Sequence, residues 1–364
     1  MYLEQLSITD FKNIASATLR FSPHINCIIG NNGEGKTNLL DAIYCLSMTK
    51  SYFGGSDLSN IRHGQPFFLL QGCFQQGESA AQVHCGVQRD GGKVIKHNNK
   101  VYQRLTDHIG LFPLVMISPT DHALINESGE ERRKYLNGLL SQFDREYLNA
   151  MLRYNHILLQ RNKLLKTPLN SGAMDVLLTL NEQLGQYGQL IYERRRQLVE
   201  NLQPYFQKIY TKLSKDKEEV SLGYRSDLDK GLLTDLLQQH FERDKVLQHT
   251  STGIHRDDLT MHLDGYPLRR TGSQGQQKTY LLALKLAQFD LLYQRKGFHP
   301  LLLLDDIFDK LDAGRIHELI SLVAHEAFGQ IFFTDSNKVR LNSMVQELTG
   351  NYATFTAEGG TFNQ

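Results

Sequence analysis

Tryptophan is absent from the 364-residue sequence, and cysteine is scarce. The four cysteines show no CxxC pairing, so we interpret them as reduced packing residues: Cys27, Cys45, Cys73 and Cys85. Uninterrupted apolar runs, such as residues 301–304, are only a few residues long, far short of the ~20 that span a bilayer. The first six residues (MYLEQL) have neither a basic start nor an apolar signal core. We therefore expect a cytoplasmic protein without a membrane segment.

Net charge is also small, at +1, so the chain as a whole is no polycation and any nucleic-acid surface must be local. Residues 130–217 hold 15 Lys/Arg and 9 Asp/Glu, a local net of +6 that leaves −5 for the remainder. Two basic clusters lie in this region, at residues 132–134 and 194–196. The pattern favours DNA-phosphate contacts without base reading, but a solvated helix face with pairs such as Glu130 and Lys134 explains it equally.

The length of the chain predicts two lobes, or one large domain that carries an insertion. The first 120 residues have the alternation and turns of strands, with hairpin turns expected at residues 90–92 and 98–99. Helical spacing follows over residues 130–166 and 173–213, and Pro204 is expected to kink or end the second helix. The C-terminal part alternates helix and strand: a helix over 274–294, a strand over 301–304, a helix over 312–327 and a strand over 330–334. Alternation of this kind indicates a largely parallel, covered sheet.

One segment after an apolar strand fits the phosphate-loop pattern GxxxxGK[ST]. Its glycines let backbone N–H groups turn inward around a phosphate, its lysine can reach the β- and γ-phosphates, and its threonine hydroxyl can hold Mg²⁺. An amphipathic helix follows directly, as an anion site at a helix N-terminus requires. We therefore expect ATP to be bound by Gly30, Asn31, Asn32, Gly33, Glu34, Gly35, Lys36 and Thr37.

A second segment supplies carboxylates. The strand over residues 301–304 ends in Asp305 and Asp306, and a phosphate loop needs an acid from a neighbouring strand to orient its metal. We expect Asp305 to hold Mg²⁺ with Thr37, and Asp306 to act as general base toward the attacking water. The alternative is a strand that ends in a helix cap, which aspartate also favours.

The third segment, Thr271-Gly272-Ser273-Gln274-Gly275-Gln276, opens the helix before the acidic strand. Ser273 with Gln276 is a capping box, so helix capping alone explains it. The order of this segment, the acidic strand and then Asp309-Lys310-Leu311-Asp312 nevertheless resembles the ABC-type ATPases. That resemblance implies that Ser273 and Gly275 contact the γ-phosphate held by a second subunit, so that ATP joins two copies head to tail.

Spacing narrows the resemblance further. About 270 residues separate the phosphate loop from the acidic strand, with a short helical insertion between them. A chain of this size with such an arm resembles the RecF family of bacterial recombination mediators. Four further segments resemble that family, at residues 6–13, 118–121, 132–136 and 253–258, although Ile254 stands where the family has proline. After the last strand Thr334-Asp335-Ser336 stands where a histidine γ-phosphate sensor would be.

The resemblance implies an α/β fold: an ABC-type P-loop ATPase head that carries an inserted, mostly helical arm. We expect the head over residues 1–120 and 250–364 and the arm over 121–249. The family resemblance further implies a weak, DNA-stimulated ATPase that acts as a switch and dimerises on ATP. Such a protein binds duplex DNA or single-strand/duplex junctions, and works with RecO and RecR to load recombinase during repair, replication restart and the SOS response.

Two other functions stay open on the sequence. An ABC ATPase that serves a transporter needs a coupling surface and has no reason for a basic helical arm. A monomeric P-loop phosphotransferase would move phosphate to a small acceptor, and the segments around Ser273 and Asp309 argue against it.

Overall fold

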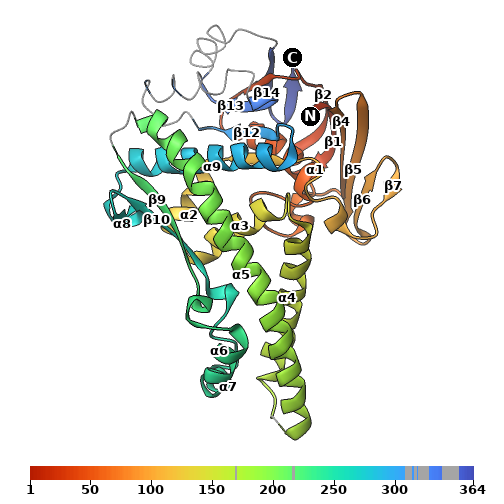
Figure 1. Cartoon of the computed structure of the whole chain (residues 1–364). Coiled ribbons are helices and arrows are strands. Elements are labelled where there is room, and N and C mark those ends of the chain that lie inside the picture. The colour runs from red at the N-terminus through yellow and green to blue at the C-terminus, as the bar shows by residue number, and fades with distance from the viewer. Residues whose placement is uncertain (169, 215–217, 308–313, 315–317, 319–327, 338–351) are drawn as a thin grey trace. The chain divides into compact units, whose positions relative to one another are not determined.

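A computed structural model (Figure 1) describes the chain apart from residue 169 and the segments 215–217, 308–313, 315–317, 319–327 and 338–351. The expected loop at residues 309–312 lies outside the described residues, as does the helix expected over 312–327 except for residues 314 and 318. The chain forms two compact units. We call Met1–Asp121, Lys212–Lys215 and Lys278–Gln364 the sheet unit, and His122–Thr211 with Asp216–Gln277 the helical unit.

A mainly parallel sheet organises the sheet unit. Its strand order is β15 (Thr361–Asn363), β14 (Tyr352–Glu358), β3 (Ile25–Ile29), β13 (Ile331–Asp335), β12 (Leu301–Asp305) and β8 (Leu114–Ile117). All pairs are parallel except β14 with β15. Every residue of β3, β12 and β13 is buried, as strands covered on both faces require. The predicted parallel sheet is confirmed.

A second sheet in the same unit is antiparallel. Its order is β2 (Ile14–Arg20), β1 (Tyr2–Phe11), β4 (Phe67–Gln76), β5 (Ser79–Gln88), β6 (Gly92–His97) and β7 (Lys100–Val101). The predicted turn between β5 and β6 is confirmed, and Asn98 and Asn99 turn between β6 and β7 with positive φ. Helix α1 (Lys36–Met48) contacts strands of both sheets and contributes Leu39, Leu40, Ile43 and Leu46 to one hydrophobic core.

Two long helices dominate the helical unit and run side by side in Figure 1: α4 (Arg145–Leu164) and α5 (Ser171–Ser214). Shorter helices accompany them, namely α2 (Ala123–Asn126), α3 (Gly129–Leu140), α6 (Leu233–Gln239), α7 (Phe241–Leu247) and α8 (Leu268–Thr271). A three-stranded sheet completes the unit, in the order β11 (Tyr266–Pro267), β10 (Asp258–Leu263), β9 (Val220–Arg225). The stretch of helical spacing over 130–166 forms two helices, because residues 141–144 end α3 and cap α4.

Pro204 does not end α5, which continues for ten residues beyond it. Proline removes one backbone donor, but Phe206, Ile209 and Tyr210 beyond it are buried. Packing of these side chains offsets the lost hydrogen bond. Of the two expected outcomes at Pro204, an end of the helix is excluded, and a kink stays a prediction.

The helical unit reaches Gln277, beyond the arm boundary that we expect at residue 249. The reason is strand pairing: β10 pairs along its whole length with β9, from Asp258 opposite Arg225 to Leu263 opposite Val220. Residues 250–277, including Ser273, thus belong to the helical unit. Helix α9 (Gln274–Lys296) begins there, and its residues from Lys278 onward belong to the sheet unit.

Candidate functional site

The phosphate-loop segment lies where β3 ends and α1 begins. Gly35 caps α1 with φ near 103°, and Gly33 has φ near 87°, a region that residues with a Cβ rarely occupy. The Lys36 ammonium lies against the loop itself, donating to the Gly30 carbonyl at 2.6 Å and the Asn31 carbonyl at 2.9 Å. Lys36 is buried, at 6% exposure. The loop therefore concentrates a positive charge and a helix N-terminus at one point, which suits a bound phosphate.

Neighbouring elements hold this loop tightly. A Cβ on Gly30 would lie 2.5 Å from the Ala357 carbonyl oxygen on β14, so only glycine fits there. From the β1–β2 turn, Asn13 donates to the Gly33 carbonyl at 3.1 Å and accepts from the Asn38 amide at 2.8 Å. These contacts fix the loop backbone from two sides, so its amide groups are preorganised.

A further support comes from the turn between β14 and β15. The Glu34 side chain accepts a hydrogen bond from the Gly359 amide, and the Gly360 amide donates to the Glu34 carbonyl at 3.0 Å. Sequence reasoning missed this turn, which lies more than 320 residues from the loop. Its only signal is the Gly359-Gly360 pair, which marks a tight turn without showing what the turn contacts.

The Thr37 hydroxyl and the Asp305 carboxylate are brought together as predicted. Thr37 Oγ1 donates to Asp305 at 2.9 Å and 3.1 Å from its two carboxylate oxygens. The acid comes from the strand after next in the sheet, because β13 lies between β3 and β12. Thr334 of that intervening strand also donates to Asp305, at 2.8 Å. Thr37 reaches the acid because it sits one residue into α1, beyond the end of β3.

Burial raises the pKa of the Asp305 carboxyl, which is only 3% exposed. Hydrogen bonds from Thr334 and Thr37 favour the charged form and oppose this rise, as does the Lys36 charge, whereas the Asp306 carboxylate adds to it. A bound cation would stabilise the ionised carboxylate. Thr37 and Asp305 offer a hydroxyl and a carboxylate, the hard oxygen ligands that suit Mg²⁺, which commonly completes its octahedron with water and nucleotide phosphates.

Asp306 follows β12 directly and is partly buried. Its φ is 46°, in the left-handed region, and its amide donates to Thr334 Oγ1 at 2.9 Å. The Thr334 hydroxyl thus contacts both acids at the carboxyl end of the parallel sheet. It donates to the Asp305 carboxylate and accepts from the Asp306 backbone amide. The left-handed backbone of Asp306 marks the end of the extended strand β12 at Asp305.

Ser273 and Gly275 belong to the helical unit, whereas the phosphate loop, Asp305 and Asp306 belong to the sheet unit. The capping box is formed: the Ser273 amide donates to Gln276 Oε1 at 2.7 Å, and the Gln276 amide donates to Ser273 Oγ at 3.3 Å. Gln276 also donates to Glu218 at 2.7 Å. Ser273 is exposed and Gly275 partly exposed, so the helix start remains accessible to another molecule.

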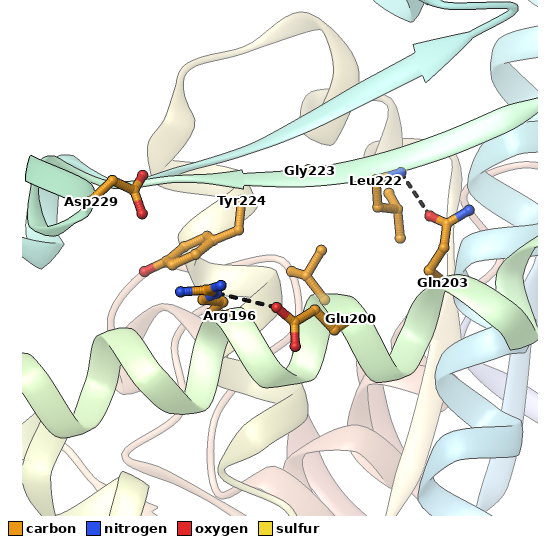
Figure 2. Close-up of a pocket in the computed structure, with 8 residues that line it drawn as sticks. Arg196, Glu200, Gln203, Leu222, Gly223, Tyr224 and Asp229 are labelled. Atoms are coloured by element: carbon orange, nitrogen blue, oxygen red, sulfur yellow. Dashed lines mark hydrogen bonds and ion pairs between the residues drawn. The ribbon is translucent and has the colours of Figure 1, made fainter.

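The two predicted basic clusters are not free cationic surfaces. In residues 194–196, Arg195 is 1% exposed and pairs with Asp257 at 3.1 Å. Arg194 pairs with Asp144 and Glu146, and Arg196 with Glu200 (Figure 2). In residues 132–134, Arg132 pairs with Asp258 at 2.6 Å, Arg133 donates to the Asp257 carbonyl at 2.7 Å, and Lys134 pairs with Glu130 and Glu131. Most of these side chains therefore pair with acids that are either near in sequence, as for Lys134 and Arg196, or distant, as for Arg132 and Arg195. Little of their charge is left unpaired, and the DNA footprint on the arm stays a prediction.

Figure 2 shows the hollow beside Arg196, a space of about 570 Å³ between α5 and β9. Gln203 closes one end by donating to the Val220 carbonyl and accepting from the Leu222 amide. None of the residues predicted to bind nucleotide lines this hollow. It is a feature of the helical unit alone.

Comparison with known proteins decides the family. The family model described as RecF/RecN/SMC N terminal domain matches residues 2–360. A protein named DNA replication and repair protein RecF from Bacteroides fragilis is 44% identical, covering 100% of this chain and 98% of its own. One of the same name from Parabacteroides distasonis is 47% identical, covering 99% and 98%. This chain belongs to the RecF family.

Solved structures agree with RecF membership. The structure described as recombination mediator protein RecF-ATP in the RecFOR pathway matches with a TM-score of 0.89 at 29% identity, covering 100% of this chain and 97% of that one. An Smc head bound to the C-winged helix domain of ScpA matches with a TM-score of 0.58 at 16% identity, covering 100% and 96%, which shows the fold alone. The predicted fold, an ABC-type head with a helical arm, is confirmed. No helix within the described part of the chain is long and apolar enough to cross a membrane.

Proposed function

We propose that this protein is an ATP-controlled, DNA-binding clamp that acts in DNA repair and replication. The observation that carries the proposal is the contact of Thr37 with Asp305 at the mouth of the phosphate loop. This contact places a carboxylate, a suitable ligand for a divalent cation, next to a loop that is suited to bind phosphate. The relatives named DNA replication and repair protein RecF support the cellular role, and the solved RecF-ATP structure supports the choice of nucleotide.

In the proposed site the amides of residues 30–35 and Lys36 bind the triphosphate. Thr37 and Asp305 would hold Mg²⁺, which would supply positive charge to the phosphates. To bind the triphosphate, the Lys36 ammonium turns from the Gly30 and Asn31 carbonyls to the phosphate oxygens. Asp306 positions or deprotonates the attacking water, and hydrolysis is slow, DNA-stimulated and used as a switch.

Completion of the site by a second copy is the central step. Ser273 and Gly275 of the twin are proposed to contact the γ-phosphate, so that ATP closes a homodimer and hydrolysis reopens it. The formed capping box supports this because it holds the start of α9 in a fixed shape with its amide groups at an exposed end.

The DNA contact is proposed on the β4–β7 lobe, since the arm clusters are neutralised. Residues 62–104 hold six Lys/Arg and two Asp/Glu, a local net charge of +4. Arg62 and Lys93 pair with acids, but Lys100 and Arg104 are exposed, and Lys96 is partly exposed. Contacts of this kind bind phosphates without reading sequence. Duplex DNA and single-strand/duplex junctions are the proposed ligands, and RecO-like and RecR-like mediators the proposed protein partners in recombinase loading.

Analytical ultracentrifugation tests the clamp directly. The protein is compared with ATP plus Mg²⁺ and with ADP, each with and without duplex DNA, alongside Asp306→Asn. We expect monomers with ADP, dimers with ATP, and persistent dimers for Asp306→Asn because the nucleotide is not hydrolysed. A protein that stays monomeric at high concentration with a saturating non-hydrolysable ATP analogue contradicts the proposal.

A further inference from the structure

Helix α4 packs through one face only. That face is buried against the rest of the helical unit, including α5: Arg161 donates to Asn181 at 2.8 Å, and Tyr147 accepts from Arg195 at 3.0 Å. The buried residues recur at helical spacing: Tyr147, Ala150, Met151, Tyr154, Ile157 and Arg161. The opposite face of α4 therefore points away from the unit's interior.

The outer face carries a regular stripe, which we call the α4 seam. Its six exposed residues are spaced by four, three, four, three and four positions: Arg145, Asn149, Leu152, His156, Leu159 and Lys163. This alternation is the spacing of a coiled-coil seam. Leu152 is 50% exposed and Leu159 is 69% exposed. The two leucines lie two turns apart, about 10.5 Å along the axis, so one helix laid against the seam would cover both.

Positive charge surrounds these leucines. Arg153 flanks the seam, and Lys163 and Lys166 lie at its C-terminal end; all three are exposed. Arg153 donates to a neutral group, the Tyr187 hydroxyl, at 3.1 Å. The single acid of α4 is Glu146, and its carboxylate is engaged by Arg194 of α5 at 3.1 Å. The seam thus presents apolar side chains inside a cationic border.

We propose that the α4 seam is a docking surface for an acidic amphipathic helix of a partner protein. Such a helix would place apolar residues on Leu152 and Leu159 and carboxylates opposite Arg153 and Lys163. A second copy of α4 fits poorly, since either orientation sets like charges against each other. Nucleic acid would use the cations but leave both leucines in water. This inference goes beyond the proposed clamp and uses none of its nucleotide residues.

The test uses the full-length protein and a fluorescein-labelled synthetic helix about three heptads long, with Leu at the seam positions and Glu flanking them. Binding is followed by fluorescence anisotropy. Two control peptides carry Lys in place of each Glu, or Ser in place of each Leu, and labelled duplex DNA is measured in parallel. The test variant combines Leu152→Ser and Leu159→Ser. The matched control combines Val176→Ser and Leu178→Ser on α5, where both side chains are 52% exposed but lie outside the seam.

We expect the acidic peptide to bind, with an affinity that falls as the salt concentration rises. Both control peptides should bind at least about tenfold more weakly, which means a Kd at least about tenfold higher. The seam variant should bind the acidic peptide at least about tenfold more weakly, whereas the α5 control variant should bind it as the parent does. DNA binding and ATP-driven dimerisation should be unchanged in both variants. Three results overturn the proposal: no binding of the acidic peptide, equal binding by the seam variant, or loss of DNA rather than peptide binding in that variant. The clamp proposal is tested separately, because it fails if ATP does not cause dimerisation, whatever the peptide does.

Discussion

The Lys285 ammonium lies 2.7 Å from Asp121 Oδ1 inside the sheet unit, and both side chains are more than 90% buried. Lys285 also donates to the Tyr52 hydroxyl at 2.9 Å and to the Met116 carbonyl at 3.1 Å, and Tyr52 donates to Asp121. This pair ties α9 to the end of β8 and to the segment that follows α1. It connects three elements of the sheet unit.

We predict that Lys285→Met strongly destabilises the protein. The change leaves the Asp121 carboxylate buried without its cation, and breaking a buried pair on one side costs ~3–5 kcal/mol. The measurement is the midpoint of urea unfolding followed by circular dichroism. Lys134→Met is the matched control, because Lys134 is 60% exposed and pairs only at the surface, where the loss is ~1 kcal/mol or less. Equal midpoints for the two variants contradict the assigned role of the Lys285–Asp121 pair.

The Thr37 hydroxyl should be required for Mg²⁺-dependent ATP binding. Thr37→Ala removes a ligand and the hydrogen bond to Asp305, and a bond to a charged group is worth about 1.5–3 kcal/mol, or roughly ten- to a hundredfold in Kd. Thr37→Ser keeps the hydroxyl and should bind nearly as the parent does. Isothermal titration with and without Mg²⁺ measures the difference. If Thr37→Ala loses the same affinity in EDTA as in Mg²⁺, the hydroxyl acts on the loop and not on the metal.

Mg²⁺-dependent affinity should also depend on pH through Asp305. Metal binding needs the ionised carboxylate, so affinity is complete above the raised pKa of Asp305 and is lost as pH falls through it. Thr334→Val removes a hydrogen bond that favours the charged form, so it should raise this pKa further and move the loss to higher pH. Thr334→Ser retains the hydroxyl and serves as control. A profile for Thr334→Val shifted to lower pH would falsify the assignment.

Substitution of Ser273 should separate helix capping from the shared nucleotide site. Ser273→Asp preserves an N-cap, so α9 should stay intact, yet it sets a negative charge where the twin's γ-phosphate is expected. Ser273→Arg fills the same place with bulk. We expect both variants to bind ATP as monomers with nearly unchanged Kd and to lose ATP-driven dimerisation by at least about tenfold, seen in sedimentation profiles. If both variants dimerise with ATP as the parent protein does, Ser273 is not part of the shared nucleotide site.

The β4–β7 lobe should carry the DNA contact. The double change Lys100→Glu and Arg104→Glu reverses two exposed charges, so duplex binding should weaken by about tenfold or more and show a shallower dependence on salt. Arg132→Glu would break a mostly buried pair, in which the side chains of Arg132 and Asp258 are 13% and 17% exposed, and so would also affect stability. Lys134→Glu, at an exposed position of the arm, is the control and should bind DNA normally. DNA binding is measured by fluorescence anisotropy at two salt concentrations. If Lys134→Glu weakens binding and the double variant does not, the DNA contact lies on the arm and not on the β4–β7 lobe.

The local features of this protein could be predicted from its sequence. Glycine spacing and the residues Lys36 and Thr37 define the phosphate loop because a tight turn into a helix depends on backbone freedom within a few residues. The same holds for the capping box of Ser273 and the turns at Asn98 and Asp90, where both partners lie within four positions. Strand pattern likewise predicted the parallel sheet, since buried apolar runs between helices have few other arrangements.

Only the tertiary structure decided which charges are neutralised and what holds the loop. Arg195 looks like part of a basic surface in sequence, but Asp257, 62 positions away, pairs with it in the interior. Thr334 joins Asp305 to Asp306, and Gly359 supports Glu34 across 325 positions. Pro204 stays inside a helix because the side chains beyond it are buried. Each of these depends on burial and on partners brought together by the fold, and no short-range pattern specifies either.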